Sequence, residues 1–505
     1  MDGSKRSSRL PTFAAQPKVK PEKTVTFACA ICQRDRASPV PAGSEKSSWQ
    51  RLSAALGALA LAILRHTKPA GCLDKCRRCA RIAQSRRRRP MTDLMTPTYA
   101  HNMRIIGHSD QGAGRADGVQ LMVHRGHAYV GHVFSRGFSV IDVRDPTQPR
   151  PVAYVAAPPN TWSIHLQQFD DLLLVIHAKD MFAQPELADE KNYYKGKIGS
   201  HGEAPVEQNW SAGMAVYDVS KPEAPRQIGF MPVQGGGLHR LWYVGGRWAY
   251  ASALLDGFSD YILITIDMAD PTKPALAGKY WLPGMNVAAG EVAHWPSEVG
   301  RFGLHHAIVH GDIAYCSWRD ACLAVVNVSD RTAPKLITHK VWAPPFGGGT
   351  HNALPLPRRE LLIVVDETVL DNREDGEKPI WVFDNRVTSN PISIATFPEP
   401  SDADYLKVGG HFGPHNVYEN RPDQFVSEEL IFATYQNAGV RVYDIRNKFR
   451  PVEVGACVPP PPTRLVDPRP NRPKVLHSAD VSVDRNGIVY ATDFSAGLYI
   501  MEYTG

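Results

Sequence analysis

The sequence predicts an all-β fold, a seven-bladed β-propeller of four-stranded blades, preceded by a basic, cysteine-rich leader. Two observations carry this prediction. Seven apolar runs that end in an acidic or amide residue recur along residues 100–505, and a histidine opens six of the seven repeats. Because a closed radial fold brings one position of every repeat onto a ring around its axis, these histidines are expected to meet there.

Each repeat carries a marker, an apolar run that ends in an acidic or amide residue and is followed by a turn, usually with proline. FSVIDVRDPTQP from Phe138 and MAVYDVSKPEAP from Met214 are two examples. The markers recur every 49 to 76 residues, and common propeller repeats span ~40–50 residues, so several blades are expected to carry loop insertions. The marker residues are Asp142, Asp218, Asp267, Asn327, Asp384, Asp444 and Glu502.

Between successive markers the chain shows four short β-type runs separated by Gly, Pro and Asp turns, which is the pattern of one propeller blade. The run MRIIGHS at Met103–Ser109 precedes the first repeat and matches the fourth runs RQIGFMP and VEVGACV. We therefore expect it to be the outer strand of the last blade, whose other strands end the chain. Such an exchange closes the ring and removes free sheet edges.

The marker pattern resembles the LVIVD repeat family. This resemblance covers about residues 100–505 and implies a seven-bladed β-propeller. It implies an architecture and no particular activity, because the repeat defines a fold and not a chemistry.

The repeated histidines predict a metal site at the mouth of the central channel. Crowded imidazoles repel one another when protonated, and neutral imidazoles leave lone pairs that need a partner. We expect one divalent transition metal, Mn, Fe, Zn or Cu; a ring held by hydrogen bonds and water alone is the alternative. The candidate ligands are a subset of His165, His239, His305, His351, His415 and His477, with Gln120 in the first repeat.

Further polar side chains are expected near the same face, where they would orient the ligand rings, act as general acid and base, or hold an anionic substrate group. The long loops 179–213 and 367–379 are expected to cover the channel mouth. The candidate catalytic residues are His132, His177, Arg240, Arg319, Asp366, Glu367, Tyr435 and Asp493, with His306 beside them.

The favoured function is a metal-dependent hydrolase or lyase that acts on a small oxygen-rich substrate with carbonyl or carboxylate groups. One alternative is a non-haem iron dioxygenase, and another is a binding propeller without catalysis. The histidine arrangement is similar to those of carotenoid-cleaving oxygenases and oligogalacturonate lyases, but only in the principle that separate blades supply the metal ligands.

Residues 1–90 form the leader, and residues 91–505 are assigned to the propeller. The leader contains 20 of the 57 Lys and Arg residues but 5 of the 51 Asp and Glu residues. Its closely spaced cysteines suit a zinc or iron–sulfur centre and resemble small predicted metal-binding, thioredoxin-like ferredoxin domains. Met91 also suits a translation start, in which case the leader is a start-site or fusion artefact. The cysteines are Cys29, Cys32, Cys72, Cys76 and Cys79.

Two stretches of the leader bear on partners and location. The run Arg86–Arg89 has no interleaved aromatic residues, which argues against a nucleic-acid surface. The apolar run Leu52–Leu64 is shorter than the ~18 residues of a membrane span. We therefore expect a cytoplasmic protein with a small-molecule substrate and neither a membrane nor a nucleic acid as partner.

Overall fold

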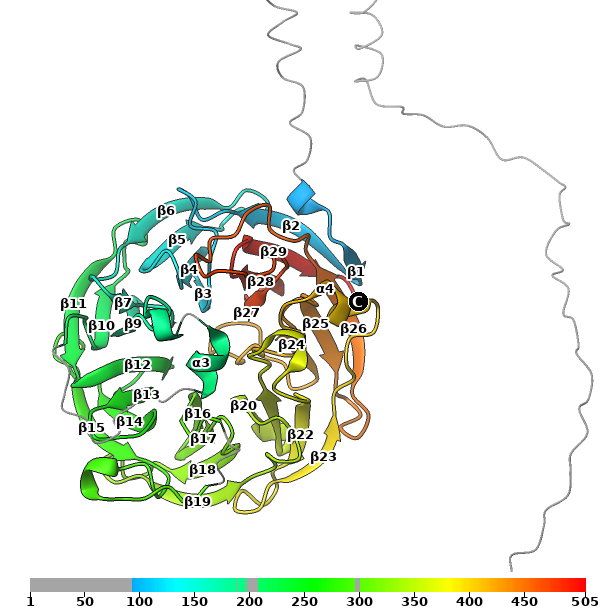
Figure 1. The fold of residues 1–505 in the computed structure, drawn as a ribbon. Helices are drawn as coiled ribbons and strands as arrows, with labels where there is room; N and C mark the ends of the chain where they lie inside the picture. Colours follow the sequence, from blue (N-terminus) through cyan, green and yellow to red (C-terminus); the bar gives the residue numbers. More distant parts are fainter. Residues whose placement is uncertain (1–92, 188, 196–197, 199–207, 296–299) are drawn as a thin grey trace, which may run out of the picture. The chain divides into compact units, whose positions relative to one another are not determined.

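The computed structural model describes residues 93–505, except for residues 188, 196–197, 199–207 and 296–299. The described residues belong to one unit, Arg88–Gly505, and most of its regular elements are β-strands. Four-stranded sheets are arranged around a common centre, with the first strand of each sheet innermost (Figure 1). This radial arrangement is that of an all-β propeller. The leader cysteines lie outside the described residues.

Three sheets in the described part of the chain each consist of four consecutive antiparallel strands. The first contains β3 (Leu121–His124), β4 (His127–Gly131), β5 (Phe138–Asp142) and β6 (Arg150–Val155). The second contains β16 (His306–His310), β17 (Ile313–Ser317), β18 (Leu323–Asn327) and β19 (Lys335–Lys340). The third contains β20 (Thr350–Leu356), β21 (Leu361–Asp366), β22 (Ile380–Asp384) and β23 (Ile392–Thr396).

A nine-stranded sheet combines two such groups, which are joined by the pairing of β12 with β9 at Gly237 and Ala178. Its first group contains β7 (Thr161–Trp162), β8 (Leu166–Phe169), β9 (Leu172–Lys179), β10 (Gly213–Asp218) and β11 (Arg226–Pro232). Its second group contains β12 (Gly235–Trp242), β13 (Trp248–Leu255), β14 (Ile262–Asp267) and β15 (Ala275–Tyr280).

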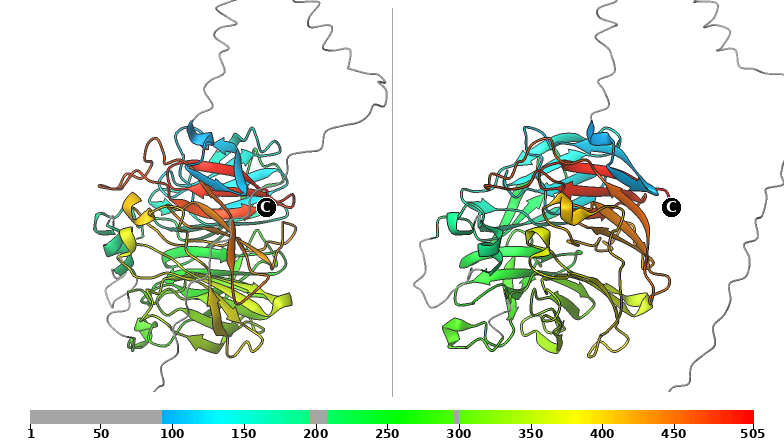
Figure 2. Two further views of the ribbon diagram at one scale, coloured as in Figure 1. Left: turned by 90° about the vertical axis from the view of Figure 1, so that its right-hand side faces the viewer. Right: turned by 45° about the vertical axis from the view of Figure 1, so that its right-hand side comes forward.

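Two sheets combine strands from opposite ends of the described chain. One contains β24 (Leu430–Thr434), β25 (Val440–Asp444), β26 (Val452–Val458) and β1 (Tyr99–His101). The other contains β27 (Ser478–Val483), β28 (Ile488–Asp493), β29 (Gly497–Tyr503) and β2 (Met103–Ser109). Strand β2 pairs antiparallel with β29, from Met103 opposite Tyr503 to Ser109 opposite Leu498. Figure 2 shows these two strands side by side, in blue and red.

The strand expected to open at His415 does not form as a regular strand in the described chain. Around it, the chain makes an isolated bridge between Val417 and Ala433. The described helices are all short; η1 precedes the first strand, and the others lie in connections between strands. They are η1 (Asp93–Met95), η2 (Pro185–Leu187), α3 (Glu190–Lys195), η3 (Val287–Ala289), η4 (Pro357–Arg359), η5 (Asp371–Arg373) and α4 (Tyr405–Val408).

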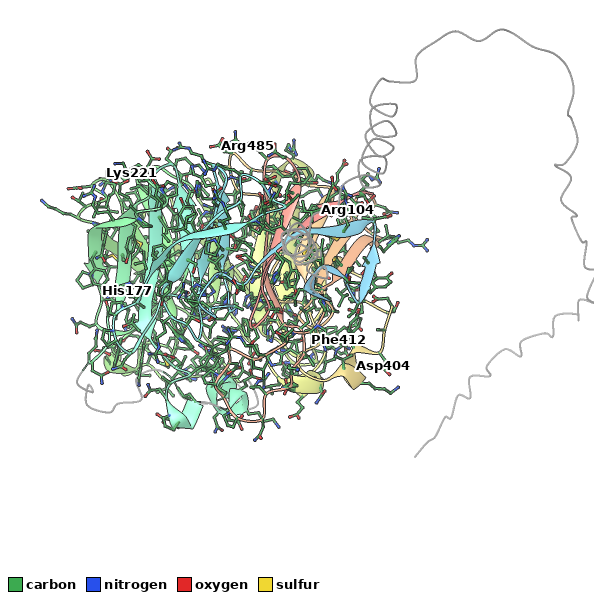
Figure 3. The ribbon with its side chains drawn as sticks, turned by 90° about the horizontal axis from the view of Figure 1, so that it is seen from above. Arg104, His177, Lys221, Asp404, Phe412 and Arg485 are labelled. Atoms are coloured by element: carbon green, nitrogen blue, oxygen red, sulfur yellow. The ribbon has the colours of Figure 1, made fainter. Side chains whose placement is uncertain are left out.

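Marker residues form hydrogen-bonded turns at the ends of their strands. The Oδ1 atom of Asp218 accepts a hydrogen bond from the backbone N–H of Ser220 at 3.0 Å, and Asn327 accepts from Ser329 in the same way at 2.8 Å. An Asp or Asn side chain that bonds the backbone two residues later forms an Asx turn. Lys221 lies just after such a turn, on the face opposite Asp404 and Phe412 (Figure 3). The markers therefore shape the face that lies away from α4.

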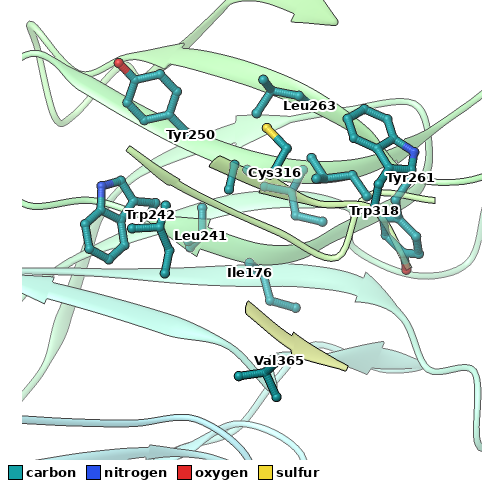
Figure 4. Packing of buried hydrophobic residues seen from close by; sticks show 14 of the residues in the cluster. Ile176, Leu241, Trp242, Tyr250, Tyr261, Leu263, Cys316, Trp318 and Val365 are labelled. Atoms are coloured by element: carbon teal, nitrogen blue, oxygen red, sulfur yellow. The ribbon is translucent and has the colours of Figure 1, made fainter. Parts of the chain in front are cut away.

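Buried apolar side chains fill the spaces between neighbouring sheets. Ile176, Leu241, Trp318 and Val365 come from different strands and belong to one large cluster (Figure 4). Glycine is required where an outer strand touches the next turn, because a Cβ on Gly229 would lie 2.4 Å from the carbonyl oxygen of Pro271. The remaining cysteines are free and buried: Cys316, Cys322 and Cys457.

No helix in the described residues is both long and apolar enough to cross a membrane.

Candidate metal centre

Five of the six predicted histidines line a single cavity of about 90 Å³. Each comes from a different repeat, and each is at least nine-tenths buried. Arg319 and Glu367, two of the predicted catalytic residues, line the same cavity. The tertiary structure therefore assembles most of the predicted ring in one place. The five histidines are His165, His239, His305, His351 and His415.

Two of the cavity histidines lie at irregular starts of inner strands. The register of β12 shifts between Leu238 and Leu241, and the register of β20 shifts between Thr350 and Asn352. His239 and His351 lie within these shifts. A β-bulge adds one residue to a strand and redirects the side chain at that point, so the inner strands turn their histidines toward the cavity.

Backbone carbonyl groups fix the ring nitrogens of three cavity histidines. His305 donates from Nδ1 to the carbonyl oxygen of His351 at 2.7 Å. His165 and His415 do the same with the carbonyl oxygens of His239 and Ala479. Because a carbonyl oxygen only accepts, Nδ1 carries the proton in each ring and Nε2 keeps a free lone pair. Metal-binding histidines in proteins are commonly held in this way.

Glu367, which directly follows β21, brings a carboxylate to two of the imidazoles. Its Oε2 atom lies 2.6 Å from His351 Nδ1, and its Oε1 atom lies 3.3 Å from His415 Nε2. One ligand atom from each of the three residues lies within 4.8 Å of the others. Two imidazoles and one carboxylate are a donor set that zinc and non-haem iron both accept.

Unpartnered nitrogen atoms support the fit of a metal to this group. The approach of His351 Nδ1 to Glu367 lacks hydrogen-bond geometry, and neither ring nitrogen of His351 has a hydrogen-bond partner within the described part of the chain. Nε2 of His305 is unpartnered in the same sense. Buried polar atoms normally find a partner, and a cation beside these lone pairs would supply one.

Burial sets the ionisation of the site. It lowers the pKa of His305 and His351 well below the ordinary value, so these rings are neutral. Burial alone would raise the pKa of Glu367, but its contacts with His351 and His415 hold that pKa well below the ordinary value. Neutral imidazoles and an ionised carboxylate are the forms that bind a metal.

Arg319 lies against Glu367 and not free in the cavity. Its Nη1 atom donates to Glu367 Oε2 at 3.0 Å. This contact leaves Oε1 on the side of His415 and holds the carboxylate between its two imidazole neighbours. Arg319 was expected to hold a substrate. In the structure it contacts Glu367 and positions the carboxylate of that residue.

Arg240 lies outside the cavity lining and spans the axis of the sheets. Its Nη2 atom donates to Glu419 Oε1 at 3.0 Å, and His306 Nε2 lies 3.0 Å from the same oxygen. Burial would raise the pKa of Glu419, but the adjacent His306 and Arg240 hold it at about 2. Arg240 thus forms a buried ion pair outside the cavity lining, and its expected role in holding an anionic substrate group stays a prediction. Glu419 had no repeat or motif to mark it in the sequence.

Three predicted catalytic residues occupy structural positions away from the cavity. Asp366 accepts hydrogen bonds from Thr350 Oγ1, Trp342 Nε1 and Trp381 Nε1, and burial raises its pKa to about 6. His132 contacts the Asp117 carbonyl oxygen at 2.5 Å and Ser139 Oγ at 2.8 Å. His177 contacts Ser211 Oγ at 2.8 Å, and burial lowers its pKa to about 4.

The remaining predicted residues also stay outside the cavity lining. Gln120 Oε1 accepts from the backbone N–H of Leu166 at 3.0 Å. His477 stacks on Phe494 with 3.9 Å between ring centroids, and the backbone N–H of His477 donates to Asp493 Oδ2. Tyr435 packs against Phe412, at 5.5 Å between centroids. These side chains support loops around the site.

Aromatic residues that the sequence prediction did not single out complete the cavity wall. They are close to one another, with 5.0 Å between the ring centroids of Trp162 and Phe182. The long loop 179–213 was expected to cover the channel, and this expectation was the sequence signal that could have identified Phe182 and Tyr193. The residues are Trp162, Phe182, Tyr193 and Phe494.

Comparisons with known proteins return a repeat and a fold. The LVIVD repeat model matches residues 307–339, which span the sheet β16–β19 almost completely. No curated protein matches the chain. One repeat therefore corresponds to one four-stranded sheet.

Similar solved structures share little sequence with this chain. A functionally unknown protein from Desulfotomaculum acetoxidans is 10% identical over 68% of this chain and 89% of its own, with a TM-score of 0.42. The β-propeller domain of Cps50 (Swd1) from Myceliophteria thermophila is 10% identical over 77% and 97%, with a TM-score of 0.46. U3-55K is 7% identical over 79% and 98%, with a TM-score of 0.47.

Proposed function

We propose that this protein is a metal-dependent enzyme in which His351, His415 and Glu367 hold one divalent transition-metal ion. The observation that carries the proposal is the approach of three ligand atoms to within 4.8 Å of one another on the wall of a cavity. The neutral state of His351 and the ionised state of Glu367 agree with it.

We infer that the fold around this site is a seven-bladed propeller closed by β2. The nine-stranded sheet is counted as two blades, because only one residue pair joins β9 of its first half to β12 of its second half. The pairing of β2 with β29 supports closure. So does the contact of Gly107 with the first blade, where a Cβ would lie 2.0 Å from the carbonyl oxygen of Pro146.

The favoured reaction is hydrolysis or lyase-type cleavage of a small carbonyl or carboxylate compound. A bound metal would supply Lewis-acid polarisation of a carbonyl or activation of water. Arg319 holds the Glu367 carboxylate in place, and the aromatic wall keeps bulk water away from the cavity. Trp162 Nε1 is buried without a hydrogen-bond partner among the described residues and is available to donate to a substrate oxygen.

A non-haem iron dioxygenase is the second candidate. It is favoured by the composition of the ligand group, because two histidines and one carboxylate are the donor set of non-haem Fe(II) oxygenases. The apolar side chains around the cavity, such as Val119, Val133 and Ile164, also suit a reaction with dioxygen.

Metal analysis of the full-length chain tests the proposal. The double variant His351→Ala/His415→Ala should hold about one ion per chain less than the wild type, because two of three ligands are gone. The matched control is His101→Ala/His310→Ala, which removes two exposed histidines and should retain the ion. Equal metal content in both variants would leave a binding propeller without a metal centre.

The identity of the lost ion separates the two reactions. Zinc or manganese would support hydrolysis or lyase chemistry. Iron that binds nitric oxide and then shows the electron paramagnetic resonance signal of a high-spin iron–nitrosyl complex would support the dioxygenase.

A further inference from the structure

We propose that residues 180–187 and 189–195 form a gate over the cavity and that Glu190 is its latch. This segment, called the gate below, contains η2 and α3 and leads out of β9. Phe182 and Tyr193 of the gate line the cavity. Figure 1 places α3 near the centre around which the sheets are arranged.

The backbone of the gate is hydrogen-bonded to the sheets at the end that leaves β9. Asp180 N donates to the carbonyl oxygen of Asn160 at 3.0 Å. Within the gate, the described backbone hydrogen bonds are local, such as Leu187 N to Gln184 O and Tyr193 N to Asp189 O. Segments without strand pairing open at a low free-energy cost, so the gate can move without disrupting a sheet.

Glu190 holds the gate shut through three cationic groups of other loops. Its Oε2 atom accepts from His411 Nε2 at 2.7 Å and from Arg472 Nη1 at 2.9 Å, and its Oε1 atom lies 3.1 Å from Arg469 Nη1. Burial would raise the pKa of Glu190, but His411 and the two arginines hold it at about 2. The carboxylate is therefore ionised and fully engaged.

Glu190, Asp371 and His411 are close enough to hold a cation themselves, but the arginines argue against it. Arg472 contacts both carboxylates, at 2.9 Å for Glu190 and 3.3 Å for Asp371, and Arg469 contacts Glu190 as well. A divalent ion there would face two guanidinium groups, against the single one of Arg319 beside Glu367, and would be repelled more strongly. The group is a set of ion pairs that spans separate loops.

Arg469 connects this latch to the cavity wall. Its guanidinium lies 4.0 Å from the ring centroid of Phe182 while it pairs with Glu190. A second attachment comes from Tyr194, whose hydroxyl donates to Asp320 Oδ1 at 2.5 Å. Release of Glu190 would therefore loosen α3 and the Phe182 side chain of the cavity wall, while the Tyr194 attachment remains.

The test measures access to the cavity in the metal-free, full-length chain. After removal of metals with a chelator, the protein is treated with diethyl pyrocarbonate, and labelling of His165, His239 and His305 is followed by mass spectrometry. Glu190→Gln should raise the labelling rate about tenfold or more, because it loses charge-assisted hydrogen bonds. Hydrogen exchange of peptides from residues 181–195 should rise in parallel.

The control is Glu186→Gln, which makes the same change at an exposed glutamate of η2 in the same gate. It should label like the wild type. A Glu190→Gln protein that labels like Glu186→Gln would overturn the proposal. Because the readout is access to histidines and not activity, the result stands whether or not the metal proposal holds.

A second variant guards against general unfolding. Arg472→Gln weakens the latch from the opposite side and leaves the gate sequence intact. It should raise cavity labelling and gate exchange without a change in the exchange of β13 or β21. If Glu190→Gln unfolds the whole chain and Arg472→Gln leaves labelling unchanged, the gate does not exist.

Discussion

His305 donates from Nδ1 to the backbone carbonyl oxygen of His351, 2.7 Å away, while the two rings stack at 3.5 Å between centroids. The carbonyl group fixes the protonated nitrogen of His305 and leaves Nε2 to face the cavity. The two residues belong to neighbouring sheets. The orientation of each potential ligand therefore depends on how one sheet packs against the next.

Cavity histidines and structural histidines should respond differently to removal. In metal-free protein, His415→Ala should alter the melting temperature little and should abolish the gain in stability on addition of metal. His132→Ala should cost ~1–3 kcal/mol of unfolding free energy, because Asp117 and Ser139 lose a buried partner. Thermal melts with and without Mn, Fe, Zn or Cu measure both. A metal-induced shift that survives in His415→Ala would remove this residue from the ligand group.

Asp366 and Glu367, the neighbouring carboxylates at the end of β21, should also differ: one substitution should affect stability and the other metal affinity. Glu367→Gln should lower metal affinity, since Gln keeps the size of the side chain and can still accept from Arg319 but lacks the charge of the carboxylate. Asp366→Asn should retain metal but lose ~1–3 kcal/mol of stability, because Asp366 accepts from one hydroxyl and two indole groups. Titration with metal measures the metal affinity of each variant, and denaturant unfolding measures its free energy of unfolding. The roles assigned here are refuted if the two variants exchange these phenotypes.

Removal of β2 should damage the fold, and removal of the leader should not. A chain that begins at Met91 keeps β2 and is expected to be soluble and folded. A chain that begins at Asp110 lacks both β1 and β2, exposes the edges of β26 and β29, and is expected to aggregate. Size-exclusion chromatography of the two truncated proteins checks this, and similar profiles would argue against closure by β2.

Acid should weaken the marker turns. The hydrogen bonds from Ser220 and the pairing with Arg226 lower the pKa of Asp218 to about 2, and contacts with Arg386 lower that of Asp384 to about 2. Because these folded-state values lie below the unfolded value of 3.8, their contribution is present above about pH 4 and is lost as the pH falls toward 2. Urea unfolding at a series of pH values should show this loss.

A natural substitution supplies the control for the acid effect. Asn327 occupies the equivalent marker position and makes the same turn hydrogen bond without a charge. Asp218→Asn/Asp384→Asn should therefore be less stable than the wild type at neutral pH, because the contribution of the two charges is absent, and should depend less steeply on pH below about 4. An unchanged slope would mean that other groups control the acid transition.

The leader cysteines lie outside the described residues, and metal content tests them. If Cys29, Cys32, Cys72, Cys76 and Cys79 form a centre, the full-length protein purified without oxygen should hold zinc, or iron with visible absorption, beyond that of the chain from Met91. Equal metal content in the two proteins would exclude a centre in the leader.

The local chemistry of the repeats was predictable because it is set by residues close in sequence. Asx turns at Asp218 and Asn327 require an Asp or Asn two residues before the bonded N–H. The resemblance of Met103–Ser109 to the fourth runs marked it as an outer strand, and that run is now paired with β29. The addition of β1 to β26 was not predicted, because three residues carry no recognisable pattern.

The sequence by itself determined the β-rich repeats, the propeller architecture and the group of histidines that meet near the axis, because each depends on spacing along the chain. Only the tertiary structure decided which polar side chains share the cavity. Asp366 and Glu367 are adjacent in sequence, but strand alternation sends one into a structural hydrogen-bond network and the other to His351. Arg240 lies outside the cavity lining, where its Nη2 atom donates to Oε1 of Glu419 at 3.0 Å, a residue 179 positions away in sequence. Such partners are brought together by sheet packing, which no local pattern encodes.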